Sequence, residues 1–189
     1  MACYIGIDIG TSGAKTALFD EAGALLASHT ADYPLYQPQN GYAEQEPEDW
    51  WNAVAEGLRA VLSKSGVGAA EVAGVGLSGQ MHGLVMLDGE GRVLRRSIIW
   101  CDQRTAAECE EMTRLVGADR LMAVTASPAL TGFTASKILW VRNHEPAVYE
   151  KCRHILLPKD YIRYRLTGEF ATEVSDASGM QLLDIGRRQ

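Results

Sequence analysis

A carboxylate, a turn of small and hydroxyl-bearing residues, and a lysine lie close together near the start of the chain. Asp8 ends a short apolar run, and Lys15 follows the turn, within the next apolar run. Glycines let backbone N–H groups approach phosphate oxygens, and Thr and Ser hydroxyls donate further hydrogen bonds. Asp8 is suited to hold Mg²⁺ directly or through water, and Lys15 supplies compensating positive charge. The pattern predicts a phosphate-binding hairpin, whose turn consists of Gly10, Thr11, Ser12 and Gly13.

Glycine-rich segments also occur for more ordinary structural reasons. A simple hairpin, whose polar side chains satisfy only their own backbone, would contain the same residue types. A Walker A loop is excluded, because Ala14 precedes Lys15 where that motif requires glycine and because the turn lies between two expected strands. The segment 74–79 matches G-x-G-x-x-G by letter, but its glycines fall within an apolar strand and no helix follows. Close strand packing explains it better than dinucleotide binding.

A second candidate site follows the expected strand 72–77. Gln80, Met81 and His82 lie in a turn flanked by glycines, at the kind of strand end where α/β proteins place ligands. The His82 ring can bond a substrate hydroxyl, although a histidine in a turn is more often structural and a methionine is usually core filler. We treat all three residues as candidate substrate contacts.

Trp100 and Asp102 form a third candidate site, after another apolar strand. An indole can form a wall against the apolar face of a sugar, or it can be an ordinary core residue. Asp102 is included among the substrate-binding candidates, although a carboxylate before a helix is typical of a capping residue. Lys159 and Asp160 are typical of the first turn of a helix. Asp176, near an expected turn, either faces a ligand or caps local structure.

The elements that must position these residues begin with strands. Turn residues separate three apolar runs, which predicts consecutive antiparallel strands over 2–9, 15–19 and 25–33. Proline, acidic residues and helical apolar spacing predict a helix over 47–65. Further strands are expected over 72–77, 84–87, 93–94 and 154–157, and further helices over 103–116, 118–124, 134–143 and 159–166. The fold class is therefore α/β, with a mixed sheet flanked by helices.

Composition excludes several classes of function. The chain has 189 residues with 47% hydrophobic and 22% charged residues, as expected for one globular domain. Its net charge is -6 without a run of Lys or Arg, so we expect no nucleic acid partner. No apolar run is long enough for a bilayer, and the start does not read as a signal peptide. The four cysteines show neither metal-binding nor disulfide spacing, which favours reduced thiols and a cytoplasmic location.

Taken in order, these segments resemble the FGGY family of carbohydrate kinases over nearly the whole chain. The first motif is shared widely among actin-like and hexokinase-like phosphotransferases, whereas Gly-Gln-Met-His-Gly is more specific to the xylulokinase-like branch of the family. The resemblance is carried by residues 5–13, 44–51, 79–83, 100–102, 132–135, 156–161 and 167–169.

The resemblance implies a ribonuclease-H-like fold of the actin/hexokinase type, with ATP and a sugar meeting in the cleft between two domains. It also implies transfer of the ATP γ-phosphoryl group to the terminal hydroxyl of D-xylulose, with ATP and Mg²⁺ as cofactors. Asp8 then matches the acidic residue near Mg²⁺ and phosphate, and Trp100 matches a pocket wall. Met81 and His82 match the sugar-binding pair. The residues that match the phosphate hairpin are Thr11, Ser12 and Lys15.

The same resemblance implies that part of the active site lies outside residues 1–189, including the catalytic aspartate and the adenosine site. We therefore expect residues 1–189 to form an incomplete N-terminal, sugar- and phosphate-facing domain, without the C-terminal domain and inactive alone. Two alternatives stay open. One is a kinase for another ketose or polyol. The other is a non-catalytic sugar-binding or assembly module, which would pair as a homodimer through an exposed apolar surface.

Overall fold

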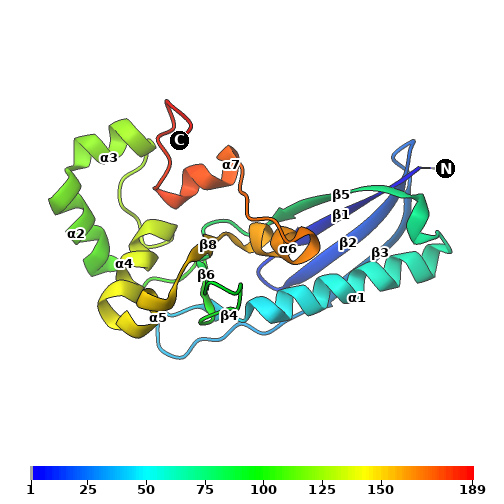
Figure 1. Ribbon diagram of the computed structural model, residues 1–189, viewed down its shortest axis with the longest axis horizontal. Coiled ribbons are helices and arrows are strands. Elements are labelled where there is room, and N and C mark those ends of the chain that lie inside the picture. The colour runs from blue at the N-terminus through cyan, green and yellow to red at the C-terminus, as the bar shows by residue number, and fades with distance from the viewer. Residues whose placement is uncertain (1) are drawn as a thin grey trace.

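A four-stranded mixed sheet forms one end of the molecule in the computed structural model, which describes residues 2–189 (Figure 1). β1 (Cys3–Ile9), β2 (Gly13–Asp20) and β3 (Leu25–Asp32) pair in antiparallel fashion, and β5 (Val72–Gly79) joins β1 in parallel. The strand order is β3-β2-β1-β5. The predicted mixed sheet with three antiparallel strands at its start is confirmed.

Helix α1 (Pro47–Ser65) covers one face of this sheet (Figure 1). Proline occupies the first turn, and Gly66 ends the helix in the left-handed conformation with φ of 73°. The helix approaches β2 closely at Gly57, where an added Cβ would lie 2.3 Å from Oγ1 of Thr16. The bounds of α1, residues 47–65, are those expected from the sequence.

The alternation of side chains along β1 decides which residues face away from α1. Cys3, Ile5, Ile7 and Ile9 are buried in the core on the helix side, whereas Asp8 is exposed. Because neighbouring residues of a strand point to opposite faces, Asp8 lies on the face that α1 leaves open. The hydrophobic core thus fixes the orientation of the predicted phosphate-binding carboxylate.

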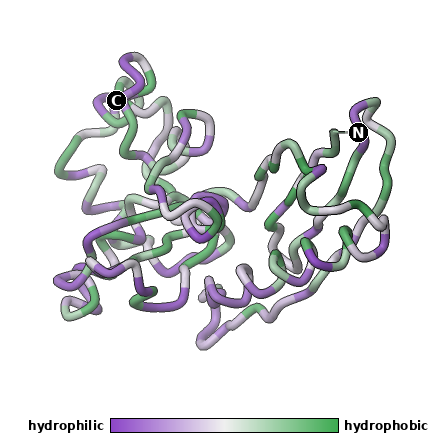
Figure 2. The backbone as a smooth tube through the Cα atoms, turned by 45° about the vertical axis from the view of Figure 1, so that its right-hand side comes forward, coloured by the Kyte–Doolittle hydropathy of each residue, from purple (hydrophilic) through white to green (hydrophobic). Residues whose placement is uncertain are grey.

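The rest of the chain forms a second lobe beside the sheet (Figures 1 and 2). It contains two small antiparallel pairs: β4 (Glu44–Gln45) with β7 (Ser97–Ile98), and β6 (Val85–Leu87) with β8 (His154–Leu156). Its helices are α2 (Ala106–Val116), α3 (Ala118–Thr125), α4 (Thr134–His144), α5 (Pro146–Lys151), α6 (Pro158–Thr167) and α7 (Val174–Ala177), and the 3₁₀ segments of the chain are η1 (Ala69–Glu71) and η2 (Ser178–Met180). α6 packs against β5, where the two lobes meet.

Several predicted boundaries were wrong. The helix expected from residue 103 begins at Ala106, because the Asp102 carboxylate accepts a hydrogen bond from the Arg104 amide and holds the intervening residues in a turn. The strand expected at 93–94 is reduced to a single bridge between Leu87 and Val93. Short elements such as α5 and α7 were not predicted at all.

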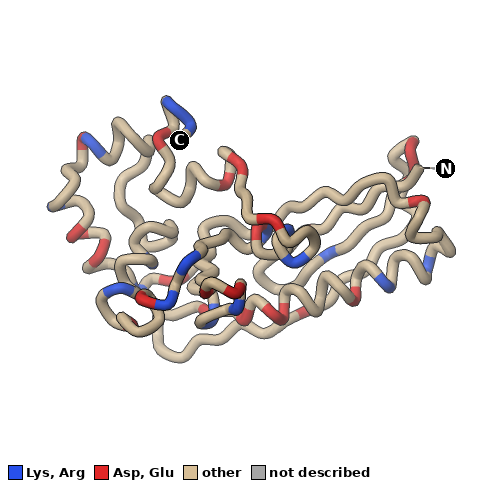
Figure 3. Tube along the Cα trace, in the orientation of Figure 1, with Lys and Arg blue, Asp and Glu red and all other residues tan. Residues whose placement is uncertain are grey.

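Charged residues of both signs are interspersed along the trace (Figure 3). This distribution accompanies the net charge of -6 and shows no stripe of Lys and Arg along any one element of residues 2–189. Within the same range, each helix is too short or too polar to cross a membrane.

Candidate functional site

Three polar side chains meet on the open face of the sheet. Asp8 lies opposite Lys15 in the register of β1 with β2, and opposite Ser78 in the register of β1 with β5. All three line an open cavity of about 370 Å³ on this face. A carboxylate, an amine and a hydroxyl in one cavity are suited to a phosphate group and its counterion. The structure thus brings the predicted pair Asp8 and Lys15 together and adds Ser78.

The β1–β2 turn is held in place by side chains from other elements. The Gly10 carbonyl accepts hydrogen bonds from the Tyr33 hydroxyl at 2.5 Å and from Nε2 of Gln80 at 3.3 Å. The Thr11 carbonyl accepts from Nε2 of Gln45 at 2.7 Å. Burial raises the pKa of Tyr33, so its hydroxyl stays protonated and continues to donate. The turn that was predicted to bind phosphate is therefore firmly positioned.

Trp100 joins this turn directly. Its Nε1 donates to Oγ1 of Thr11 at 2.9 Å, while the indole remains 40% exposed. The Thr11 hydroxyl accepts this bond and keeps its own proton for donation to another acceptor. The predicted pocket wall therefore stands beside the predicted phosphate hairpin.

Gln80 links the hairpin to the second candidate segment. Its backbone N–H donates to the Ile9 carbonyl at 2.7 Å, and its side chain donates to Oε1 of Gln45 at 2.7 Å as well as to the hairpin. The side chain is buried, and its Oε1 has no hydrogen-bond partner among the residues that the structure describes. Gln80 positions the turn in this structure, and its direct contact with substrate stays a prediction.

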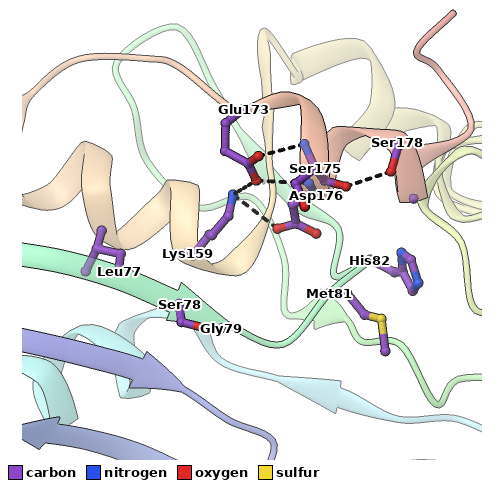
Figure 4. Close-up of a pocket in the computed structure, with 11 residues that line it drawn as sticks. Leu77, Ser78, Gly79, Met81, His82, Lys159, Glu173, Ser175, Asp176 and Ser178 are labelled. Carbon is purple, nitrogen blue, oxygen red and sulfur yellow. Dashed lines mark hydrogen bonds and ion pairs between the residues drawn. The ribbon is translucent and has the colours of Figure 1, made fainter. Parts of the chain in front are cut away.

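A cleft of about 510 Å³ opens where the carboxyl end of β5 meets α6 and α7 (Figure 4). Met81 and His82 line one part of it, and Figure 4 shows Lys159, Glu173 and Asp176 gathered on the other. Met81 is 51% exposed, so the alternative explanation of this methionine as a core residue does not apply. The predicted sugar-binding pair therefore lies at a real concavity.

The His82 ring is half-buried in the cleft and closely packed on two sides. Its ring packs edge-on against Phe133, with centroids 4.5 Å apart, and Gly179 lies so close that an added Cβ would be 2.2 Å from Cε1. Nδ1 is buried without a hydrogen-bond partner within residues 2–189. Burial, and then the charge of Lys137, lowers the pKa of His82. The neutral ring has one donor and one acceptor nitrogen, of which Nδ1 is enclosed by the protein.

The opposite part of the cleft contains an ion cluster that sequence reasoning missed. Nζ of Lys159 lies 2.8 Å from Oδ1 of Asp160, 3.1 Å from Oδ2 of Asp176 and 3.3 Å from Oε1 of Glu173. Burial raises the pKa of Asp176, and the charge of Lys159 opposes that rise. Lys159 does lie in the first turn of α6 as expected, but it also lines the cleft. The sequence did contain a signal for this role, because Lys159 follows shortly after the end of the strand β8, where α/β proteins often place ligands.

Asp102 has a structural position. It is fully buried, accepts from the Ala43 amide at 2.6 Å and pairs with Nη2 of Arg104 at 2.8 Å. Arg104 also pairs with Glu44 at 2.8 Å. Both oxygens of Asp102 are bonded within the protein, so no observation supports its predicted contact with substrate.

Comparison with known proteins gives a consistent picture. Residues 3–189 match the model of the FGGY family of carbohydrate kinases, N-terminal domain. The whole chain is 47% identical to a xylulose kinase of Bacillus subtilis, and 98% of it is 42% identical to a xylulose kinase of Escherichia coli. The chain spans 38% and 37% of the lengths of these two relatives.

Solved structures agree with this match. A xyloylose kinase from Brucella ovis superposes with a TM-score of 0.94 at 38% identity, over 99% of this chain and 39% of that one. A gluconate kinase from Lactobacillus acidophilus superposes with a TM-score of 0.89 at 30% identity, over 97% of this chain and 37% of that one. The predicted actin/hexokinase-type fold is confirmed by these neighbours. The chain belongs to the FGGY family of carbohydrate kinases.

Proposed function

We propose that residues 1–189 supply the sugar-binding and phosphate-binding parts of an ATP-dependent kinase that converts D-xylulose to D-xylulose 5-phosphate. The observation that carries this proposal is the direct link between the two candidate sites. Trp100 is bonded to Thr11 of the hairpin, and Gln80, next to Met81 and His82, is bonded to Gly10. The names of the relatives described above support xylulose as the sugar.

On the sugar side, the proposed contacts combine apolar and polar groups. The exposed thioether of Met81 and the half-exposed indole of Trp100 suit the C–H faces of a sugar. The neutral ring of His82 and the carboxylate of Asp176, in the same cleft, suit its hydroxyl groups. These residues would orient the substrate hydroxyl toward the phosphoryl donor, and orientation is a large part of phosphoryl-transfer catalysis.

On the phosphate side, Asp8 and Lys15 face the same open cavity. Proteins commonly bind Mg²⁺ through one or two carboxylates together with substrate phosphates and water, so a single exposed carboxylate fits this ion, and the lysine opposite it fits the phosphates. When bound, Mg²⁺ would neutralise charge on the ATP phosphates. Lys15 and the hydroxyls of Thr11 and Ser12 would contact phosphate oxygens directly.

The proposal assigns only part of the catalytic apparatus to residues 1–189. The chain spans 38% of the length of the Bacillus subtilis relative, and we propose that the catalytic base and the adenosine site lie outside these residues. Purified 1–189 should then show no xylulose-dependent ADP formation above background. Turnover by the purified chain would contradict this assignment. The proposed location of the kinase is the cytoplasm, where its four unpaired cysteines would stay reduced.

Titration calorimetry with D-xylulose tests the proposed function, with ribulose and glycerol as comparison ligands. Selective binding of D-xylulose by purified 1–189 that is lost in His82→Ala would support the assignment. Equal binding by wild type and His82→Ala would contradict the proposed role of His82. Circular dichroism of both samples confirms that the substitution leaves the fold intact.

A second candidate is a kinase for another polyol or sugar acid. The similarity to the gluconate kinase from Lactobacillus acidophilus favours it, because that fold match is nearly as good as the match to the Brucella ovis protein. Gluconate belongs in the same calorimetric series, and tighter binding of gluconate than of D-xylulose would favour this candidate. Sedimentation velocity on the same samples tests the expected alternative of a homodimeric module.

A further inference from the structure

Lys137 is a fully buried lysine in α4 whose amine is bonded to main-chain carbonyl groups. Nζ lies 2.8 Å from the carbonyl oxygen of His82 and 2.7 Å from that of Gly132. Burial lowers the pKa of Lys137 to about 7, against the opposing charge of Asp102. An amine in such a position costs folding free energy unless its bonds are well made. Lys137 makes two such bonds, so it holds together the two carbonyl groups to which it is bonded.

The two loops that the amine joins both border the candidate sugar site. His82 belongs to the cleft. Gly132 precedes Phe133, whose ring packs on the His82 ring, and an added Cβ at Gly132 would lie 3.0 Å from the Trp100 carbonyl oxygen. One amine therefore connects the two loops that place His82 and Phe133, close to the backbone of Trp100.

The backbone of His82 needs such support. Its φ is 63°, in the left-handed region that residues with side chains rarely adopt. Such a conformation persists when the surrounding structure holds it. Both donors found at the His82 carbonyl come from α4, since Oγ1 of Thr134 also donates to it at 3.2 Å. The start of α4 thus fixes the one residue of the cleft whose backbone is strained.

We propose that Lys137 is a positioning residue of the sugar site. By binding the carbonyl groups of His82 and Gly132 it holds the His82 turn in its left-handed conformation and keeps the ring against Phe133, where it can meet a sugar hydroxyl. The inference rests on the proposed function, because it assumes that His82 contacts the sugar. Lys137 itself touches main-chain atoms and is not assigned any contact with substrate.

The first test compares Lys137→Met with Lys151→Met, which removes an exposed lysine at the end of α5. Methionine preserves the length of the side chain but cannot donate. We expect D-xylulose to bind Lys137→Met at least about tenfold more weakly, since small displacements of binding groups are costly. Lys151→Met should bind like wild type. Circular dichroism and thermal melting show whether each variant is folded.

The second test measures the pKa of His82 in the absence of sugar, by NMR of the histidine rings. His82→Ala is used to assign the signal. The charge of Lys137 lowers the pKa of His82, so that pKa should rise in Lys137→Met and stay unchanged in Lys151→Met. If Lys137→Met does not fold, Thr134→Val removes the other donor to the same carbonyl and should weaken D-xylulose binding in the same direction.

The outcomes separate the inference from the proposed function. Failure of wild type to bind D-xylulose would count against the proposed function, while the ring signals would still show whether Lys137 acts on His82. A folded Lys137→Met with an unchanged His82 titration would overturn the inference, as would unchanged sugar affinity when wild type binds. A shifted titration together with weaker binding in Lys137→Met supports it.

Discussion

At the scale of single residues, the site depends on close approaches around one imidazole. The ring of His82 lies between Phe133 and Gly179, and its carbonyl is held from α4. Met81, the next residue toward the N-terminus, is half-exposed in the same cleft. The turn is thus held in place at His82 while both residues line the cleft.

Gly179→Ala is predicted to weaken D-xylulose binding by about tenfold or more, because the new Cβ would lie 2.2 Å from Cε1 and 2.5 Å from Nδ1 of His82 and the ring must move. The melting temperature should change little, since the displaced group is the end of a side chain. Calorimetry measures the affinity. Gly68→Ala is the matched control, because this position is exposed and the nearest atom to its added Cβ would lie 3.6 Å away. Equal affinities of the two variants would contradict the prediction.

The pH dependence of stability should reveal the buried amine of Lys137. Its pKa is lowered to about 7 in the folded chain, whereas the pKa of lysine in an unfolded chain is about 10.4. Between these values the unfolded chain binds a proton that the folded chain has lost. The contribution of Lys137 to the free energy of unfolding therefore rises with pH, by up to about 1.4 kcal/mol per pH unit.

Urea unfolding of wild type and Lys137→Met at about pH 7.5 and about pH 9 measures this effect. The difference in unfolding free energy, wild type minus variant, should shift in favour of wild type as the pH rises. Titration of cysteines and tyrosines occurs in both proteins and largely cancels. A difference that does not change with pH would show that the amine is not desolvated as the structure indicates.

At the scale of secondary structure, short elements are tied together by a buried ion network. Arg104 pairs with Asp102 and with Glu44 of β4, and its guanidinium stacks on Tyr42 at 3.8 Å from the ring centroid. Arg95 bonds the same Glu44 carboxylate at 2.8 Å. β4 and β7 each contain only two residues, so side chains rather than backbone pairing hold this region.

Asp102→Asn is predicted to lower the free energy of unfolding by about 3 kcal/mol, because it leaves the buried guanidinium of Arg104 with one charged partner fewer. Urea unfolding followed by circular dichroism measures the change. Asp119→Asn, at an exposed position in α3, should cost well under about 1 kcal/mol. Similar losses in both variants would show that the network contributes little.

The sequence predicted the long elements well and the short ones poorly. α1 was expected at its observed bounds and the first three strands within two residues of theirs, since helical apolar spacing indicates a helix and short apolar runs between turn residues indicate strands. Two-residue strands have no period to detect, and the six-residue α5 is less than two turns long. The expected strand at 93–94 became one bridge, because β6 pairs with the distant β8 instead.

The same division applies to the candidate site. Asp8 and Lys15 could be placed together because a hairpin fixes the register of neighbouring strands. The roles of Lys137 and Lys159 at the site could not be predicted, since His82 is far from Lys137 in sequence and Asp176 lies in the unpredicted α7. Aspartate is common both at ligand contacts and at helix caps, and only the burial of Asp102 in the folded chain distinguishes these two roles.

At the scale of the whole molecule, the cavity on the open sheet face adjoins the cleft at the carboxyl end of β5. β5 connects them, because Ser78 lines the cavity beside Asp8 as well as the cleft beside His82. A phosphate group held at the first and a sugar held at the second would therefore be neighbours. This arrangement is the central claim of the proposed function.

Methyl NMR of methionine-labelled protein tests the sugar half of that claim most directly, because two methionines of nearly equal exposure report on different places. Met81, 51% exposed, lines the cleft, whereas Met122, 49% exposed, lies on α3. Addition of D-xylulose should shift the Met81 methyl signal along a saturable curve and leave the Met122 signal unchanged. An unchanged Met81 signal at sugar concentrations where calorimetry detects binding would place the sugar elsewhere and contradict the account.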